Sequence, residues 1–311
     1  MRRRFYAPPD AFAPDGATVA LSREETQHLR GVLRLKAGDE AFVFDGAGRE
    51  YACVVVAATA AGEGGRRVGE TATLEVRGRV EPQRPESPLD LTLAVALLKG
   101  EKFDLVVQKA TELGVWRIVP VETKRADVRL GREGGNGREA AARFARWRRL
   151  ALEAAKQSGR ARLPEVCAPV AFAALVAAGE ASASAHEGAA GAAGAAHEGA
   201  ARASAHEGAA GAAAHEGVAG VAGVAGDGGE RRLFFTERGG RGLAETVREW
   251  PARPAKLTAL VGAEGGWDDE EIARASAAGW HAVTFGGRIL RAETAAVVVT
   301  GLLQHLYGDL V

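Results

Sequence analysis

Apolar runs alternate with helical patterns over residues 91–311, and this alternation restricts the possible folds more than any other feature of the chain. The run LTLAVALL is continuously apolar, as in a parallel strand that is covered on both faces. The next stretch, EKFDLVVQKATELG, places apolar residues from Phe103 to Leu113 at helical spacing and ends at Gly114. WRIVPVET, RLFFTE, KLTALVG and HAVTFG continue the series as strands. We therefore predict an α/β domain with a mostly parallel sheet.

The first 80 residues follow a different pattern, in which short β-rich runs alternate with glycine turns. TVAL, EAFVFDGAGREYACVVVAA and ATLEVRGRV are such runs, and they predict a small β-barrel. Within this part, Ser22 and Glu25 have the spacing of a capping box at a helix start. EPQRPESPLD then places three prolines in ten residues. We predict a barrel domain of residues 1–80, a linker of residues 81–90 and an α/β domain of residues 91–311.

Residues 180–229 form a low-complexity insertion of Ala and Gly in which HEG recurs at four histidines. These are His186, His197, His206 and His215. Metal binding is one interpretation of the repeated His-Glu pairs. Their spacing in a glycine-rich segment defines no coordination geometry, so we favour an expanded surface loop and predict no metal site.

The overall charge identifies no partner, because 40 basic residues balance 40 acidic ones. Between Lys99 and Glu165, however, the sequence contains sixteen Lys and Arg but only nine Asp and Glu. This local excess of positive charge indicates either a basic binding patch or a solvated helix face. Cys53 and Cys167 lack metal-ligand spacing and are predicted to be core thiols in a reducing compartment. The chain has no apolar run of 18 residues, so we predict a cytoplasmic protein without a membrane span.

Two glycine-bearing loops follow predicted strands and are the main candidates for a functional site. LVGAEGGWDDEEI ends a strand at Gly262, and Asp268 with Glu271 predicts a helix cap beyond it. FGGRILRAETAAVVVTG repeats this design after the next strand. Ligands of parallel sheets bind beyond the carboxyl ends of the strands, and glycines let the backbone approach a ligand closely. The two loops predict one shared pocket, with tight strand-to-helix turns as the structural alternative.

Polar residues near predicted helix ends have structural or functional interpretations. Glu293 is favoured at a helix N-terminus by the helix dipole alone, whereas Arg291 has no equivalent structural reason to be there. In EAAKQSGRARLPEV, residues Gln157 to Arg160 lie where a helix is predicted to stop, so they form either a helix C-cap or a polar cluster with a binding role.

Five motifs in order resemble the RsmE family of the SPOUT superfamily. They are HLRGVLRLKAGDEAFVFDGAGREY, LLKGEKFDLVVQKATELGVWRIVPVET, RWRRLALEAAKQSGRARLPEV, LVGAEGGWDDEEI and FGGRILRAETAAVVVTGLLQHLYGDL. Together they cover nearly the whole chain apart from the insertion. The resemblance implies a PUA-like barrel, a SPOUT domain with a trefoil knot, a homodimer, and S-adenosylmethionine-dependent methylation of uracil N3 in 16S rRNA of the small ribosomal subunit.

The resemblance also implies which residues bind the cofactor. These are Gly262, Glu264, Gly265, Gly266, Phe285, Gly286, Ile289, Leu290 and Ala295. The sequence departs from the family at Ala263 and Gly287, where prolines are usual. We expect the loss of both prolines to loosen the loops by adding freedom to the unfolded chain, without removing a contact group.

For catalysis, we hypothesise that Arg291 stabilises negative charge on the uracil carbonyls while Glu293 orients the arginine or acts as the base. The residues that we expect to contact RNA are Arg2, Arg3, Arg4, His28, Arg30, Arg34, Lys99, Arg125, Arg160 and Arg162. The helix of residues 292–306 packs either in a dimer interface or only within its own subunit. Two alternatives stay open. The chain is then another SPOUT RNA methyltransferase, which acts on tRNA or on a ribose of rRNA, or a noncatalytic RNA-binding factor in ribosome assembly.

Overall fold

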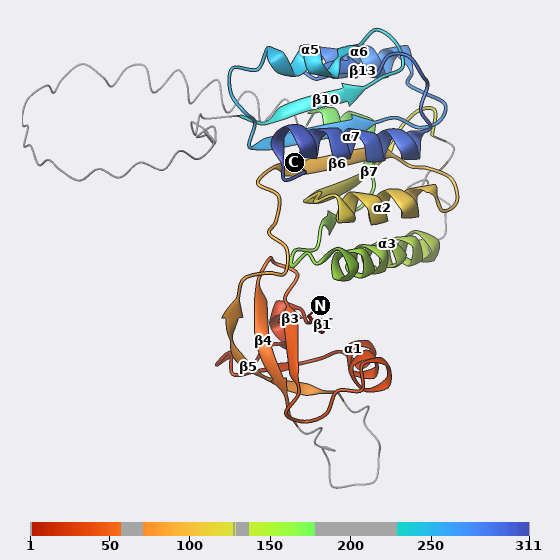
Figure 1. Cartoon of the computed structure of the whole chain (residues 1–311). Helices are drawn as coiled ribbons and strands as arrows, with labels where there is room; N and C mark the ends of the chain where they lie inside the picture. Colours follow the sequence, from red (N-terminus) through yellow and green to blue (C-terminus); the bar gives the residue numbers. More distant parts are fainter. Residues whose placement is uncertain (1, 57–70, 127, 129–136, 178–228, 311) are drawn as a thin grey trace, which may run out of the picture.

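The computed structural model describes residues 2–56, 71–126, 128, 137–177 and 229–310. It contains two sheets, a curled N-terminal sheet and a larger one that helices cover on both faces (Figure 1). The strands of the N-terminal sheet pair in the order β1-β3-β4-β5-β2. They are β1 (Arg4–Tyr6), β2 (Thr18–Ala20), β3 (Glu40–Phe44), β4 (Glu50–Val55) and β5 (Thr73–Val80). Between β2 and β3, helix α1 (Arg23–Gln27) continues into a π-helical turn, η2 (His28–Val32).

The strands of the second sheet all pair in parallel, in the order β11-β13-β10-β12-β6-β7-β8, and β9 also pairs with β7. They are β6 (Asp90–Ala96), β7 (Arg117–Glu122), β8 (Glu165–Val166), β9 (Val170–Ala171), β10 (Arg231–Phe235), β11 (Arg241–Gly242), β12 (Lys256–Val261) and β13 (His281–Thr284). The predicted α/β class with a mostly parallel sheet is therefore confirmed.

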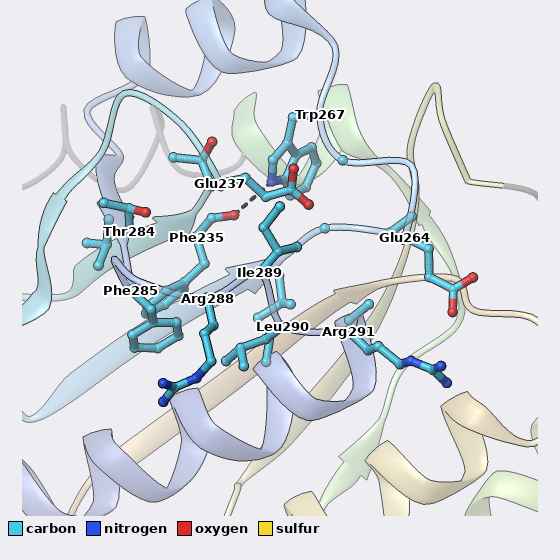
Figure 2. A pocket seen from close by; sticks show the side chains of 18 of the residues that line it. Phe235, Glu237, Glu264, Trp267, Thr284, Phe285, Arg288, Ile289, Leu290 and Arg291 are labelled. Carbon is cyan, nitrogen blue, oxygen red and sulfur yellow. Dashed lines mark hydrogen bonds between the residues drawn. The ribbon is translucent and has the colours of Figure 1, made fainter.

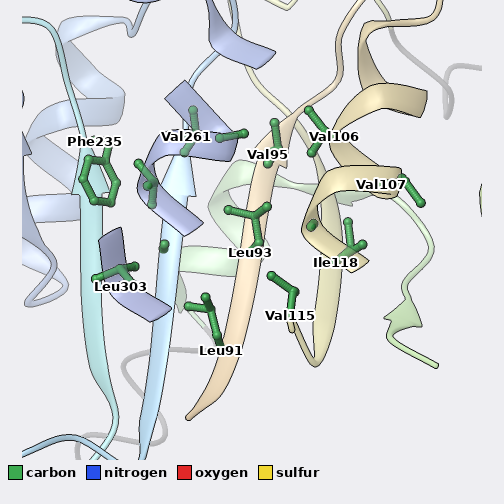
Figure 3. Close-up of a cluster of buried hydrophobic side chains, with 14 of the residues drawn as sticks. Leu91, Leu93, Val95, Val106, Val107, Val115, Ile118, Phe235, Val261 and Leu303 are labelled. Atoms are coloured by element: carbon green, nitrogen blue, oxygen red, sulfur yellow. The ribbon is translucent and has the colours of Figure 1, made fainter. Parts of the chain in front are cut away.

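Helices cover both faces of this sheet, because residues on both faces of its strands are apolar. Leu91, Leu93 and Val95 of β6 pack with α2 and α7 in one buried cluster (Figure 3). On the opposite face, Phe234 and Leu260 pack with Ala275 of α6. The helices are α2 (Lys102–Glu112), α3 (Gly137–Ser158), α5 (Leu243–Arg248), α6 (Asp269–Ala277) and α7 (Ala292–Tyr307). In the described part of the chain, none of them is long and apolar enough to cross a membrane.

Two buried arginines connect the N-terminal sheet to the rest of the chain. Arg4 bonds to Glu50 (3.2 and 3.3 Å) and to the carbonyl of Arg160 (2.8 Å). Arg160 bonds in turn to Glu86 (2.8 and 3.0 Å) and to the carbonyls of Thr111 and Val115. We expected both arginines to contact RNA, but they are 7% and 4% exposed and are held by these partners. Their role is structural, and we withdraw them as RNA contacts.

The cysteines differ from each other in the structure. Cys53 lies fully buried in the core of the N-terminal sheet, and this burial raises the pKa of its thiol to about 12. Cys167 is only partly buried, so the prediction of a core thiol is confirmed for Cys53 alone. The insertion 180–229, with its four HEG histidines, lies outside the described residues except for its last position. The domain limits at residues 80 and 90 and the trefoil knot stay predictions.

Candidate functional site

A cavity of about 530 Å³ lies at the carboxyl ends of three neighbouring strands, β10, β12 and β13 (Figure 2). Its walls are the segments that directly follow these strands. They comprise Phe235 to Glu237, Val261 to Glu264 with Gly266 and Trp267, and Val283 to Ala292 with Ala295. The volume falls in the range of small-molecule sites, and the position is the one expected for ligands of parallel sheets.

A buried tryptophan fixes the wall that follows β12. The indole Nε1 of Trp267 donates a hydrogen bond to the carbonyl of Phe235 at the end of β10 (2.8 Å). A Cβ atom on Gly262 would lie 2.8 Å from this indole ring, so only glycine fits there without displacing the tryptophan. Gly266 has a φ of +68°, a conformation that suits glycine. Two glycines of GAEGG therefore have structural reasons, Gly262 in packing and Gly266 in backbone geometry.

The same loop is anchored at its far end by charged groups. Asp268 caps α6 in a full capping box with Glu271, as the sequence predicts. Nζ of Lys124 bonds to the carboxylates of Asp268 (2.9 Å) and Glu270 (2.6 Å), and the hydrogen bond from Lys124 lowers the pKa of Asp268. These bonds hold the loop after β7 against the start of α6, beside the cavity.

The wall that follows β13 is more open. Ile289 is 81% exposed, and Gly286 and Gly287 are exposed as well. Gly287 has a φ of +87°, which a proline ring cannot adopt because it holds φ near −65°. We expected the missing proline to act only through the unfolded chain. At Gly287 the folded loop differs as well, because a proline cannot adopt its backbone conformation.

The two predicted catalytic residues lie at the start of α7 and face different surroundings. Arg291 is the exposed residue before the helix and lines the cavity, with its guanidinium pointing outward in Figure 2. Glu293 is half-buried and is not part of the lining. Its Oε2 atom is buried and has no hydrogen-bond partner among the described residues. An unpaired buried carboxylate oxygen is costly, so its presence needs an explanation.

Most of the predicted cofactor residues line the cavity. They are Gly262, Glu264, Gly266, Phe285, Gly286, Ile289, Leu290 and Ala295. Gly265 lies outside the lining and packs against the backbone of Arg125. Sequence analysis missed the third wall, which Phe235, Thr236 and Glu237 form. Its signal was present in FFTERGG, which also places glycines after a strand, but only the strand order shows that β10 lies between β12 and β13.

The charged side chains of the lining carry both signs. Glu264 forms an ion pair with Lys102 at the start of α2. The side chains of Glu237, Arg288 and Arg291 have no hydrogen-bond or ion-pair partner among the residues that the structure describes. The cavity can therefore offer one free carboxylate and two free guanidinium groups to a ligand. Within the described ranges, no three His, Cys, Asp or Glu side chains gather to hold a metal ion.

The other predicted RNA-contacting residues are distributed over both sheets. Arg3, Arg34, Lys99 and Arg125 are exposed. Arg2, His28, Arg30 and Arg162 are half-buried. Arg2 bonds to Glu50, and the guanidinium of Arg162 stacks on Trp116 at 4.1 Å from the ring centre. The exposed set is therefore the more accessible part of the predicted RNA-contacting residues.

Comparison with known proteins gives matches along the whole chain. The sequence model of an RNA methyltransferase domain matches residues 85–208 and 224–304, and that of an RNA methyltransferase PUA domain matches residues 21–60. Two relatives are named ribosomal RNA small subunit methyltransferase E. The one from Synechocystis is 29% identical, and the match covers 93% of this chain and 74% of the relative. The one from Mycobacterium bovis is 28% identical, and the match covers 97% of this chain and 91% of the relative. A Neisseria gonorrhoeae protein of that name, solved with bound S-adenosylmethionine, is 25% identical with a TM-score of 0.68, covering both chains completely.

We expect Gly262→Ala to destabilise the protein and Gly286→Ala to be tolerated, although both residues line the cavity. The added methyl group at 262 collides with Trp267, whereas a Cβ at 286 has no atom within 4 Å. Overpacking of this kind costs about 1–3 kcal/mol. Urea unfolding of both variants measures the difference, and equal stability of the two would contradict the packing account.

Proposed function

The chain belongs to the RNA methyltransferase family whose sequence model it matches over most of its length, and we propose that it methylates N3 of a uridine in the 16S RNA of the small ribosomal subunit, with S-adenosylmethionine as the methyl donor. The observation that carries this proposal is the cavity at the ends of β10, β12 and β13. The Neisseria gonorrhoeae relative that is solved with bound S-adenosylmethionine supports the choice of cofactor.

The residues of the cavity fit such a cofactor. The glycines at 262 and 266 leave backbone exposed to a ligand, and Phe285, Ile289 and Leu290 offer apolar surface for a purine ring. The exposed guanidinium group of Arg288 can pair with the carboxylate of the cofactor, which leaves Arg291 to the uracil. When bound, S-adenosylmethionine supplies a methyl group on a positively charged sulfur atom. The protein must then position the uracil nitrogen and handle its proton.

Arg291 and Glu293 are the side chains that we propose for this task. Arg291 reaches the mouth of the cavity and would stabilise negative charge on a uracil carbonyl as N3 loses its proton. Glu293 and Arg291 form no ion pair in the described structure. The absence of this pair is evidence against a role in orienting Arg291. It leaves Glu293 as the candidate for the base, which requires that N3 of the uracil reach the start of α7, since Glu293 does not itself line the cavity.

We propose further that a homodimer acts in the cytoplasm and binds RNA through the exposed cationic residues of both sheets. Support for the dimer comes from three leucines at the C-terminal end of the chain, Leu302, Leu306 and Leu310, which are each about two-fifths exposed. Apolar side chains that gather on one surface often mark an interface. Support for RNA binding comes from Arg3, Arg34, Lys99 and Arg125.

The function can be tested with small-subunit rRNA from a strain that lacks this protein. Purified protein and S-adenosylmethionine should produce 3-methyluridine, detected by mass spectrometry of the nucleosides. Arg291→Ala should lower the rate about 100-fold while cofactor binding persists, because loss of one charge-stabilising group has an effect of this size. Arg248→Ala on α5 is the matched control. A wild-type rate for Arg291→Ala would refute the role, and methylation of another atom or of tRNA would refute the proposed reaction.

RNA binding should weaken steeply with salt, because each phosphate that a Lys or Arg neutralises releases a counterion. We expect Arg34→Ala to reduce the slope of log affinity against log salt concentration by about one unit. Filter binding or fluorescence anisotropy with a fragment of 16S rRNA measures this slope. A slope that is flat in the wild-type protein would exclude the cationic surface.

Light scattering tests the dimer. We expect the mass of two chains at micromolar concentration, and Leu306→Asp should shift the protein toward the mass of one chain, because a charge at an apolar contact is destabilising. A single-chain mass for the wild-type protein contradicts the dimer.

A further inference from the structure

Glu237 places a free carboxylate in the cavity, on the wall that the sequence analysis missed. It follows β10 and belongs to the lining together with Phe235 and Thr236. The other carboxylate of the lining, Glu264, is already paired with Lys102. Glu237 has no hydrogen-bond or ion-pair partner in the described part of the chain. It is therefore the carboxylate that a bound molecule can use without breaking an ion pair of the protein.

The backbone around Glu237 is held in place from both sides. Trp267 bonds to the carbonyl of Phe235, two residues before it. The Thr236 hydroxyl donates to the carbonyl of Arg238 (3.0 Å) and accepts from the amide of Arg238 (3.3 Å), which closes a tight turn over Glu237. Three residues later, Gly240 lies so close to β13 that a Cβ would be 2.6 Å from the backbone of Val283. The carboxylate thus projects from a fixed loop.

The position of Glu237 relative to the other charges decides which group it faces. Its Oε2 lies beside Gly266, at 3.7 Å from the point where a Cβ would be. Figure 2 shows Glu237 next to Trp267, while the guanidinium groups of Arg288 and Arg291 point away from it. A ligand in the cavity therefore meets a carboxylate near Trp267, while the two guanidinium groups lie away from it and point in different directions (Figure 2).

S-adenosylmethionine carries four kinds of group that a carboxylate could bind: the sulfonium, the ammonium, the adenine amino group and the ribose hydroxyls. A carboxylate at the amino group would bind adenosine and 2′,3′-dideoxyadenosine alike, so a comparison of these two ligands distinguishes it from a carboxylate at the hydroxyls. A fixed carboxylate at the sulfonium would stabilise a charge that methyl transfer removes, and so would raise the barrier. The ammonium is attached to the same carbon atom as the carboxylate of the cofactor, and that carboxylate pairs best with an arginine. The ammonium therefore lies at the arginine side of the cavity, away from Glu237. The two ribose hydroxyls are neighbouring donors, and an acidic residue that follows a parallel strand is suited to accept from both.

Resting on the proposed function, we infer that Glu237 is a cofactor-binding residue that accepts hydrogen bonds from the ribose hydroxyls of S-adenosylmethionine. The carboxylate then fixes the nucleoside at the Trp267 side of the cavity. This leaves Arg288 and Arg291 to the amino-acid end of the cofactor and to the uracil.

The test compares ligands with and without the hydroxyls in three forms of the full-length protein. Adenosine and 2′,3′-dideoxyadenosine each displace S-adenosylhomocysteine in a calorimetric competition. The wild-type protein should prefer adenosine roughly tenfold or more, because hydrogen bonds to a charged group are strong. Glu237→Ala should lose that preference. Glu153→Ala, which removes an exposed carboxylate of α3, should keep it.

A second measurement separates the hydroxyls from the sulfonium. Glu237→Ala should weaken S-adenosylmethionine and S-adenosylhomocysteine by the same factor, since both contain the ribose. Weakening of S-adenosylmethionine alone would overturn the inference in favour of the sulfonium, and a preserved adenosine preference in Glu237→Ala would overturn it outright. A wild-type protein that binds neither ligand would instead overturn the proposed function, and the inference with it.

Discussion

The parallel pairing of β10 with both β12 and β13 is the constraint on which the rest of the site depends. Phe235 of β10 pairs with Val261 on one side and with Val283 on the other, so three strands end at the same level. Their loops meet at one edge of the sheet although residues 230 and 290 lie far apart in sequence. No single loop forms the cavity, and each supplies something different: packing glycines after β12, an open glycine pair after β13, and a free carboxylate after β10.

Burial of large side chains turns this arrangement of strands into a defined shape. Trp267 fills the space that Gly262 leaves and binds the end of β10, so the loops after β12 and β10 cannot move independently. At the other end of the molecule, Arg4 and Arg160 join the N-terminal sheet to the linker through Glu50 and Glu86. These buried bonds connect the N-terminal sheet to the part of the chain that carries the cavity.

The sequence predicts the strand and helix series because hydrophobic periodicity depends on local neighbours. It also predicts the loops after β12 and β13, because several glycines directly after an apolar run are typical of a loop that lets a ligand approach the end of a strand. The loop after β10 was missed because its role depends on strand order, which periodicity does not contain. The burial of Arg4 and Arg160 was missed for the same reason, since their partners lie 46 and 74 residues away. The positive φ of Gly287 is likewise a property of the folded loop. A glycine permits such a φ, but its presence in the sequence does not predict it.

The central claim is that three strand-end loops form one binding site, and hydrogen exchange monitored by mass spectrometry tests it most directly. Adding S-adenosylmethionine should slow exchange together in the peptides that cover residues 235–240, 262–267 and 285–295. Peptides around another cavity, of about 380 Å³ beside Thr123 and Arg274, should be unchanged. Protection of this other cavity alone, or of no peptide at all, would contradict the account.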